Sequence, residues 1–173
     1  MTEYRYVNKP RRTKEDRRFV TGQGSFVGDI KCRAMKHVAL VMSPFPSAEI
    51  KSIDASEALA LDGVHYVLTG TELENATNSL MSGLDLPNYQ RYPLASKVTR
   101  YAGEWVAAVV ADSRYIAEDA AELVYVDYDT LDFVVDPEEA IKPGAPIVHP
   151  EIGGNVFFQR KFEWGAVDDD FSS

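Results

Sequence analysis

Apolar residues along this chain alternate with polar segments in a layout that predicts two similar units. The first unit has strands over 38–42 and 64–68 with a short helix between them, and the second has strands over 106–111 and 123–128 with a helix over 112–122. The first strand of each unit is almost entirely apolar, which is typical of a strand covered on both faces. We therefore expect an α+β domain in which both units share one mixed sheet, with both helices on one side.

The second unit has the clearer periodicity. Its helix carries apolar residues at spacings of three and four, the pattern of one buried helical face: Ile116, Ala117, Ala120, Ala121 and Leu123. In the strand that follows, apolar and polar residues alternate, so one face is expected to be buried. That face comprises Val124, Val126 and Tyr128.

Helix ends are predicted from capping residues. Asp54 is placed to cap the first helix, with Glu57 at the spacing of a capping box, and Gly63 is placed to end it. A further helix is expected to begin at Asp136-Pro137, because proline favours the first helical position and two acidic residues follow it.

The segments without periodicity divide the chain further. We expect residues 1–36 to form an extended basic arm and a turn-rich loop leading into the core, 37–142 the core, and 143–173 a Pro/Gly connector with an acidic tail. Within the core, residues 71–96 are expected to form a long irregular loop. Loops of that length in a compact domain are usually functional or ordered by a partner.

Charge is unevenly distributed along the chain. The net charge of −9 argues against nucleic acid as a partner, because phosphate binding needs a basic face. Residues 1–36 nevertheless hold ten basic and four acidic residues, a net charge of +6, which leaves −15 on the remainder. A basic arm on an acidic body indicates contact with an acidic surface, which is either this domain's own surface or that of another chain.

Glycine and histidine motifs give no local sign of chemistry. Gly22, Gly24 and Gly28 are spaced G-x-G-x-x-x-G, which departs from the dinucleotide fingerprint, so this segment is interpreted as a turn. The three histidines, at positions 37, 65 and 149, form no metal-binding motif.

The single cysteine, Cys32, excludes an internal disulfide and cannot alone hold zinc or an iron–sulfur cluster. It has no evident base beside it, so catalysis by this thiol is disfavoured. Single-cysteine usage favours a cytoplasmic protein, and no apolar run approaches the ~20 residues that span a membrane.

Four segments, in the same order, resemble one known domain. They are residues 18–30, the S-P-F-P-S-A-E-I-K-S-I-D run at 43–54, V-T-R-Y-A-G-E-W-V-A-A-V-V-A at 98–111, and the close from Asn155 to Phe171. Together they resemble the a/b hammerhead domain of the large subunit in the xanthine dehydrogenase and aldehyde oxidase family. Residues 59–65 and 113–117 are also similar to the aerobic carbon monoxide dehydrogenase large subunit.

The chain also departs from the family pattern. Ser47 stands where the family commonly has His, Trp105 where it usually has Pro, and Ala166 where it usually has Asp. None of these departures removes a known catalytic group. The bulky Trp105 is expected to alter the start of its strand.

The resemblance implies a part of a molybdenum hydroxylase, which oxidises its substrate with oxygen from water. In that family the pterin-binding loops and the catalytic glutamate lie in domains that follow the hammerhead. We therefore expect a non-catalytic structural subunit or fragment that binds no cofactor itself. Molybdopterin, [2Fe-2S] and FAD are expected in partner chains.

The expected partners are a molybdopterin-binding large subunit, an iron–sulfur small subunit and, in some complexes, an FAD-binding medium subunit. Partner contacts are predicted at Arg11, Arg12, Arg17, Arg18, Gly103, Glu104 and Trp105. Two other hypotheses stay open: a free-standing binding or regulatory module with this fold, and a small enzyme that uses Cys32 or its carboxylates.

Overall fold

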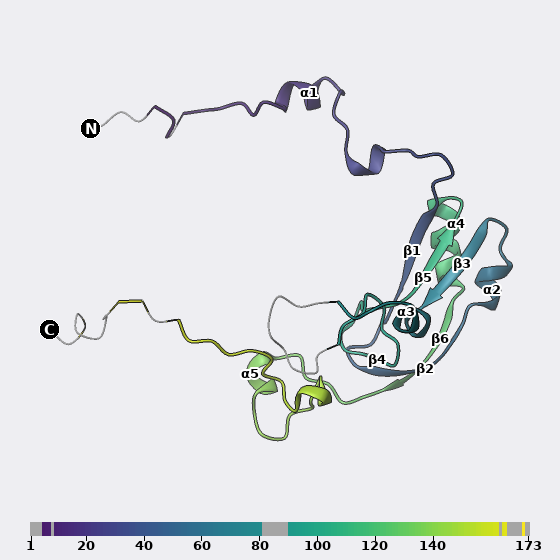
Figure 1. The fold of residues 1–173 in the computed structure, drawn as a ribbon, viewed down its shortest axis with the longest axis vertical. Coiled ribbons are helices and arrows are strands. Elements are labelled where there is room, and N and C mark those ends of the chain that lie inside the picture. The colour runs from purple at the N-terminus through teal and green to yellow at the C-terminus, as the bar shows by residue number, and fades with distance from the viewer. Residues whose placement is uncertain (1–4, 8, 81–89, 163, 166–170, 172–173) are drawn as a thin grey trace. The chain divides into compact units, whose positions relative to one another are not determined.

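The computed structural model describes residues 5–7, 9–80, 90–162, 164–165 and 171. The chain divides into two compact units, Met1–Met35 and Lys36–Ser173. The first unit is the smaller, and the second contains both sheets and the core (Figure 1).

The first unit contains two short helical turns, α1 (Asp16–Val20) and η1 (Val27–Asp29). The expectation of a wholly extended arm was therefore wrong. The Asp16 carboxylate accepts hydrogen bonds from the backbone N–H and the hydroxyl of Thr13, and these bonds stabilise the first turn. The glycine segment turns as predicted, with Gly22 at φ +71°, and the rings of Phe19 and Phe26 stack across it at 5.4 Å.

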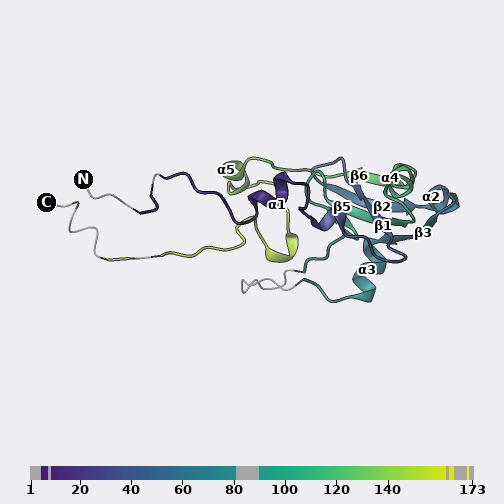
Figure 2. The same ribbon diagram turned by 90° about the horizontal axis from the view of Figure 1, so that it is seen from above.

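The second unit is built on two three-stranded sheets, and every strand pair in them is antiparallel. The first sheet has the order β1-β5-β3, with strands His37–Met42, Trp105–Ala111 and Val64–Thr69. The second has the order β4-β2-β6, with strands Val98–Thr99, Ala48–Asp54 and Tyr125–Thr130. Figures 1 and 2 show the two sheets from perpendicular directions.

The two strand-helix-strand units are confirmed, but a single mixed sheet shared by both was wrong. Strand β6 does not belong to the first sheet. It pairs with β2, a strand that was not predicted from the sequence. The register of β2 shifts between Ile50 and Ser52, so Lys51 is skipped in the backbone register with β6, although its Nζ atom lies 3.5 Å from Asp129 Oδ2 on that strand. This bulge breaks the alternation of apolar residues and hides the strand from a period-two pattern.

The described part of the second unit also has five helical segments: α2 (Ser56–Ala60), α3 (Gly70–Ala76), α4 (Arg114–Glu122), α5 (Pro137–Ala140) and η2 (Pro150–Ile152). Helix α4 packs against β1 and β5, and α2 packs against β3 and α4, so both unit helices lie on one side of the first sheet as predicted. Figure 2 shows α3 on the opposite side of the strands from α4.

The core is formed largely of small residues. It comprises Ala58, Val67, Ala107, Val109, Ala120 and Val124, each with at most 8% of its surface exposed. Alanine on both α2 and α4 lets the helices approach the sheet closely. Along β6, Val126 and Tyr128 are half-buried while their neighbours are exposed, which confirms the predicted buried face.

Helix starts follow the predicted chemistry in part. The Asp136 carboxylate accepts from the backbone N–H groups of Glu138 (2.7 Å) and Glu139 (3.2 Å), so the helix predicted there is confirmed. The helix predicted from Asp54 begins at Ser56, and its N-cap Ala55 makes no capping bond. The capping box expected there is thus wrong, although Asp54 Oδ1 does accept from Ser56 N at 2.9 Å.

The predicted irregular loop over 71–96 begins instead with α3. Thr69 and Glu72 form a reciprocal capping box, in which the Thr69 hydroxyl accepts from Glu72 N and the Glu72 carboxylate accepts from Thr69 N at 2.9 Å. A T-x-x-E spacing is a signal that the sequence does contain. Residues 81–89 of that loop lie outside the described residues.

Candidate functional site

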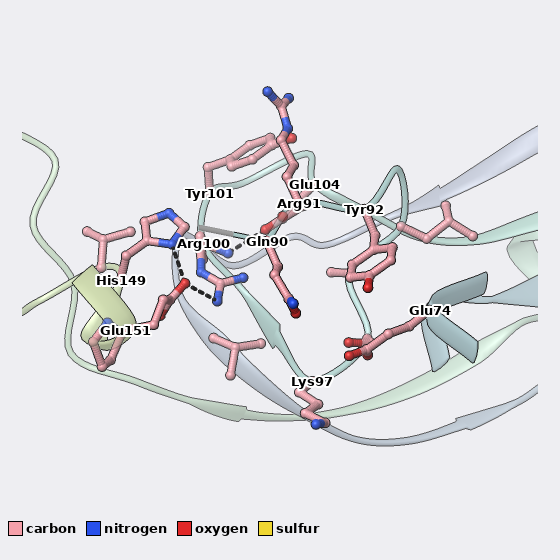
Figure 3. A pocket seen from close by; sticks show the side chains of 16 residues that line it. Glu74, Gln90, Arg91, Tyr92, Lys97, Arg100, Tyr101, Glu104, His149 and Glu151 are labelled. Carbon is pink, nitrogen blue, oxygen red and sulfur yellow. Dashed lines mark hydrogen bonds and ion pairs between the residues drawn. The ribbon is translucent and has the colours of Figure 1, made fainter. Parts of the chain in front are cut away.

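A polar cavity of about 670 Å³ lies in the second unit, between the end of α3, the segment 90–104 and the connector at 148–151. Figure 3 shows the side chains that line it. Three basic residues (Arg91, Lys97 and Arg100) face three acidic residues (Glu74, Glu104 and Glu151) around its wall. The described lining therefore has no excess of formal charge that would favour an anion over a cation.

Arg100, His149 and Glu151 form a network in the lining of this cavity. Arg100 follows directly after β4, and its Nη2 atom lies 3.5 Å from Glu151 Oε1. The same oxygen lies 2.9 Å from His149 Nδ1, as the dashed lines in Figure 3 show. His149 is only 9% exposed and packs edge-on against Phe157, with ring centroids 4.7 Å apart.

The electrostatics of Glu151 follow from these contacts. Partial burial by itself would raise the pKa of the carboxyl, because it disfavours the charged form. The hydrogen bond from His149 and the charge of Arg100 oppose that effect, and the pKa of Glu151 lies below its ordinary value. The group is therefore an ionised partner in a structural bridge, which ties the connector to the segment after β4.

Asn155 fixes the connector that carries His149 and Glu151. Its side-chain oxygen accepts from Val148 N at 2.9 Å. Its amide nitrogen donates to the carbonyls of Ala140 and Pro146, both at 2.9 Å. The side chain thus bonds to three backbone groups of the Pro/Gly-rich connector. Residues 141–149 of this connector form no strand or α-helix that would order them otherwise.

Gly103, Glu104 and Trp105 occupy the turn that leads into β5. Gly103 adopts φ +89°, a conformation that favours glycine, and its N–H donates to Ser43 O at 2.8 Å. The Glu104 carboxylate accepts from Arg100 N, and Trp105 pairs with Met42 across the strands. The pairing of β1 with β5 shifts register at this point, between Val41 and Met42.

Arg11, Arg12, Arg17 and Arg18 belong to the first unit and are exposed or nearly so. The Arg11 guanidinium lies 4.8 Å from the centre of the Tyr6 ring and donates to Arg5 O, and Arg18 lies 5.2 Å from the Phe19 ring. Within the part of the chain that the structure describes, the four arginines make no ion pair with a carboxylate. These arginines belong to the first unit, and the turn at Gly103–Trp105 belongs to the second.

A second charged cluster lies at the edge of the first sheet. His65 is the residue skipped where β3 shifts register against β5, and its Nε2 lies 2.8 Å from Asp112 Oδ1. Lys36 also donates to Asp112. The hydrogen bond from Lys36, followed by that from His65, lowers the pKa of Asp112 to about 2.

The described residues supply no cluster of metal ligands. They contain no group of three or more His, Cys, Asp or Glu side chains that could hold a metal ion. A [2Fe-2S] cluster needs four ligands, and the sequence has one cysteine. In the cavity, Arg100 Nη2 lies 3.5 Å from Glu151 Oε1.

The comparisons with known proteins agree with this fold. The family described as aldehyde oxidase and xanthine dehydrogenase, a/b hammerhead domain, matches residues 21–132. The chain belongs to this family. It is 39% identical to the carbon monoxide dehydrogenase large chain of Hydrogenophaga pseudoflava, over 90% of this chain and 20% of that protein.

Two further relatives extend the picture of the hammerhead family. A probable xanthine dehydrogenase subunit of Bacillus subtilis is 32% identical over 96% of this chain and 22% of its own length. The crystal structure of quinoline 2-oxidoreductase from Pseudomonas putida 86 superposes with a TM-score of 0.78 at 38% identity, covering 84% of this chain and 19% of that one. The chain therefore spans about a fifth of the length of these hammerhead relatives.

Sequence reasoning missed the network of Arg100, His149, Glu151 and Asn155. The sequence placed His149 in no motif, and in the structure it contacts Glu151 and Phe157. About fifty residues separate Arg100 from Glu151, so no local spacing could join them. The available signal was Asn155 after two glycines, a polar residue able to bond to the backbone of a segment without regular structure.

Proposed function

We propose that this chain is a non-catalytic structural part of a molybdenum-dependent hydroxylase. The observation that carries the proposal is the span of the match: a hammerhead family member that corresponds to about a fifth of each relative. The mixed-charge cavity supports it, because Arg100 and His149 in its lining both pair with Glu151. In this proposal molybdopterin, [2Fe-2S] and FAD are held by partner chains.

The turn at Gly103–Trp105 is proposed as one contact surface for those partners. Met42 and Trp105 lie opposite each other at the end of the first sheet, and both remain substantially exposed. Aromatic residues and methionine are enriched at interfaces, where they supply apolar area with little loss of conformational freedom. Gly103 shapes the turn that presents this pair.

The exposed arginines of the first unit are proposed as a second contact surface. Arg11, Arg12, Arg17 and Arg18 offer guanidinium groups that stack on aromatic rings and pair with carboxylates in two-point contacts. Such groups are frequent in the energetic centre of interfaces. An acidic surface on a partner chain is the complement that their charge favours.

Purification from native extract tests the proposal. A tagged chain is expected to co-purify with a polypeptide that carries molybdopterin and with an iron–sulfur chain, and substitution Trp105→Ala should weaken that association. Leu59→Ala, at an exposed position on α2, is the matched control. Elution of the tagged chain alone, under conditions that preserve known hydroxylase complexes, would instead support a free-standing binding module.

A further inference from the structure

Strand β1 is an open edge of the first sheet. It pairs with β5 on one side, and no strand of the described chain pairs with it on the other. Figure 1 shows β1 as the outermost strand of this sheet. Because an antiparallel strand directs its backbone groups alternately to its two sides, half of the N–H and C=O groups of His37–Met42 point away from β5. Such groups are a template for pairing with another strand.

The other edges of the two described sheets carry features that hinder such pairing. Strand β3 shifts register at His65 and packs against α2 and α3. Strand β4 has two residues, and β6 carries Asp127 and Asp129. Short strands, irregular register and charged side chains are the usual means by which an edge is protected from pairing. Strand β1 has six residues, none of them Asp, Glu, Lys or Arg, and its register is regular as far as Val41.

A groove of about 680 Å³ lies along this edge, between the whole of β1 and one face of α4. Helix α4 begins shortly after the end of β5 that pairs with His37, and it packs against both β1 and β5. Since β5 is antiparallel to β1, α4 runs in the same direction as β1. The helix side of the groove is formed by Arg114, Glu118, Ala121 and Glu122.

The charges on this helix face are self-complementary. Arg114 begins α4 with its side chain 77% exposed, and Glu122 ends the helix and is exposed. A two-fold axis makes two copies of α4 antiparallel, so that Arg114 of each copy lies beside Glu122 of the other and one favourable contact is made twice. Glu118, midway along the face, meets its own counterpart, but its carboxylate accepts from Arg114 Nε of its own helix at 2.8 Å.

The strand side of the groove is self-complementary as well. Ala39 pairs with Val109, which packs in the core on the α4 side of the sheet, so Val38 and Leu40 face the other side. Val38 is 60% exposed and Leu40 is half-buried. Two copies of β1 paired antiparallel about Ala39 set Val38 of each copy against Leu40 of the other. Such cross-strand apolar pairs stabilise a sheet.

We propose that the β1 edge is the interface between two copies of this chain, which join their three-stranded first sheets into one continuous sheet with both α4 helices on one face. A parallel arrangement would set Arg114 against Arg114, so the charges select the antiparallel one. The interface is isologous and closes at two copies. The inference goes beyond the proposed function and does not depend on it.

Sedimentation velocity of the purified chain tests the dimer without any partner chain. Between about 1 and 100 µM we expect a monomer–dimer equilibrium with a Kd on the order of 10 µM. Raising the salt concentration should weaken association, because exposed charges carry part of the specificity. A monomer throughout this range, or oligomers that grow beyond two copies, would overturn the inference.

Charge reversal on α4 tests the two-fold arrangement. Arg114→Glu and Glu122→Arg should each weaken association about tenfold or more, because two attractive contacts become repulsive. An equal mixture of these two variants should associate again, since each then supplies the charge that the other lacks. Asp119→Arg is the control, on the same helix but outside the groove, and should change association less than about threefold. Failure of the mixture to recover would overturn the two-fold arrangement.

A lysine on the strand tests the edge itself. Val38→Lys should weaken association on the order of 30-fold, because a charged side chain on an edge opposes pairing. Tyr125→Lys, at an equally exposed position on the edge strand β6, is the matched control and should leave association unchanged. Thermal unfolding of each variant checks that the fold is retained. A wild-type dimer that Val38→Lys leaves intact would overturn the inference.

Hydrogen–deuterium exchange identifies the occupant of the edge. Amides of residues 37–42 are expected to exchange more slowly at concentrations where the free chain is dimeric than where it is monomeric. Protection of these amides only in a complex with a molybdopterin-binding polypeptide would assign the edge to that chain and overturn the dimer. The co-purification that tests the proposed function is decided separately, so the two failures are distinguishable.

Discussion

Single residues set how closely the segments of this fold approach one another, and Gly70 is the clearest case. A Cβ atom at Gly70 would lie 2.0 Å from the carbonyl oxygen of Ala95 and 2.4 Å from its carbonyl carbon. Both are backbone atoms, which cannot move aside as the end of a flexible side chain can. Gly70 therefore joins the start of α3 to the segment before β4 by direct backbone contact.

We expect Gly70→Ala to destabilise the protein by about 2–3 kcal/mol or more, since overpacking against a fixed backbone forces a shift of one segment. Chemical denaturation measures this change. Gly154→Ala is the control, because a Cβ there meets nothing within 4 Å. Equal midpoints for the Gly70 variant and the wild type would contradict the close approach.

The ion pairs of Asp112 predict a dependence of stability on pH. The pKa of this carboxyl in the folded chain is about 2, against an ordinary value of 3.8. A depressed pKa means that the ionised form stabilises the fold above the ordinary value, and that this contribution is lost as pH falls through about 2. The side chain is half-exposed, so solvent screening keeps the contribution small.

Substitution Asp112→Asn should therefore flatten the decline in stability between pH 4 and pH 2, with little change in the rest of the profile. Thermal unfolding across this range checks it. Asp119→Asn serves as the control, because this exposed carboxylate on α4 shows no ion pair within the described residues. A profile for the Asp112 variant that is parallel to that of the wild type would contradict the assignment.

At the scale of elements, the sequence predicted those whose signal is local. Strand β5 is an apolar run, α4 carries a buried face at helical spacing, and β6 alternates by two. Strand β2 was not predicted, because the bulge at Lys51 shifts its alternation of apolar and polar residues by one position. Helix α3 lies in the segment predicted to be an irregular loop, because the capping box between Thr69 and Glu72 was not recognised in the sequence.

Pairing between distant elements could not be predicted in the same way. The partition into two sheets depends on which edge accepts β6, and that choice is made by packing around the whole core rather than by any one segment. The same limit applies to the site. Arg100 and Glu151 meet only because β4 and the connector are brought together by the fold.

The connector provides the element-scale prediction. Asn155→Ala removes three hydrogen bonds and leaves backbone groups of Val148, Ala140 and Pro146 without that partner. We expect a loss of about 1–3 kcal/mol and faster amide exchange at Val148 and Glu151. Asn78→Ala, at an exposed position after α3, should leave both unchanged. Retained protection of Val148 in the Asn155 variant would show that another contact orders the connector.

At the scale of the whole molecule, the chain combines a stable sheet-and-helix core with surfaces that it does not cover itself. The core is formed by buried alanine and valine side chains, most of which lie on α2, α4 and the first sheet. The exposed arginines of the first unit, the Met42–Trp105 pair and the open edge of β1 all lie outside it. No helix within the described residues is long and apolar enough to cross a membrane.

The central claim is that this polypeptide supplies structure and contact surface while the reactive centre is held by other chains. Elemental analysis of the rigorously purified lone chain measures this most directly, with molybdenum and iron quantified per polypeptide. We predict less than about a hundredth of an atom of either metal per chain, against stoichiometric amounts in the co-purified complex. Stoichiometric molybdenum on the lone, folded chain would contradict the account.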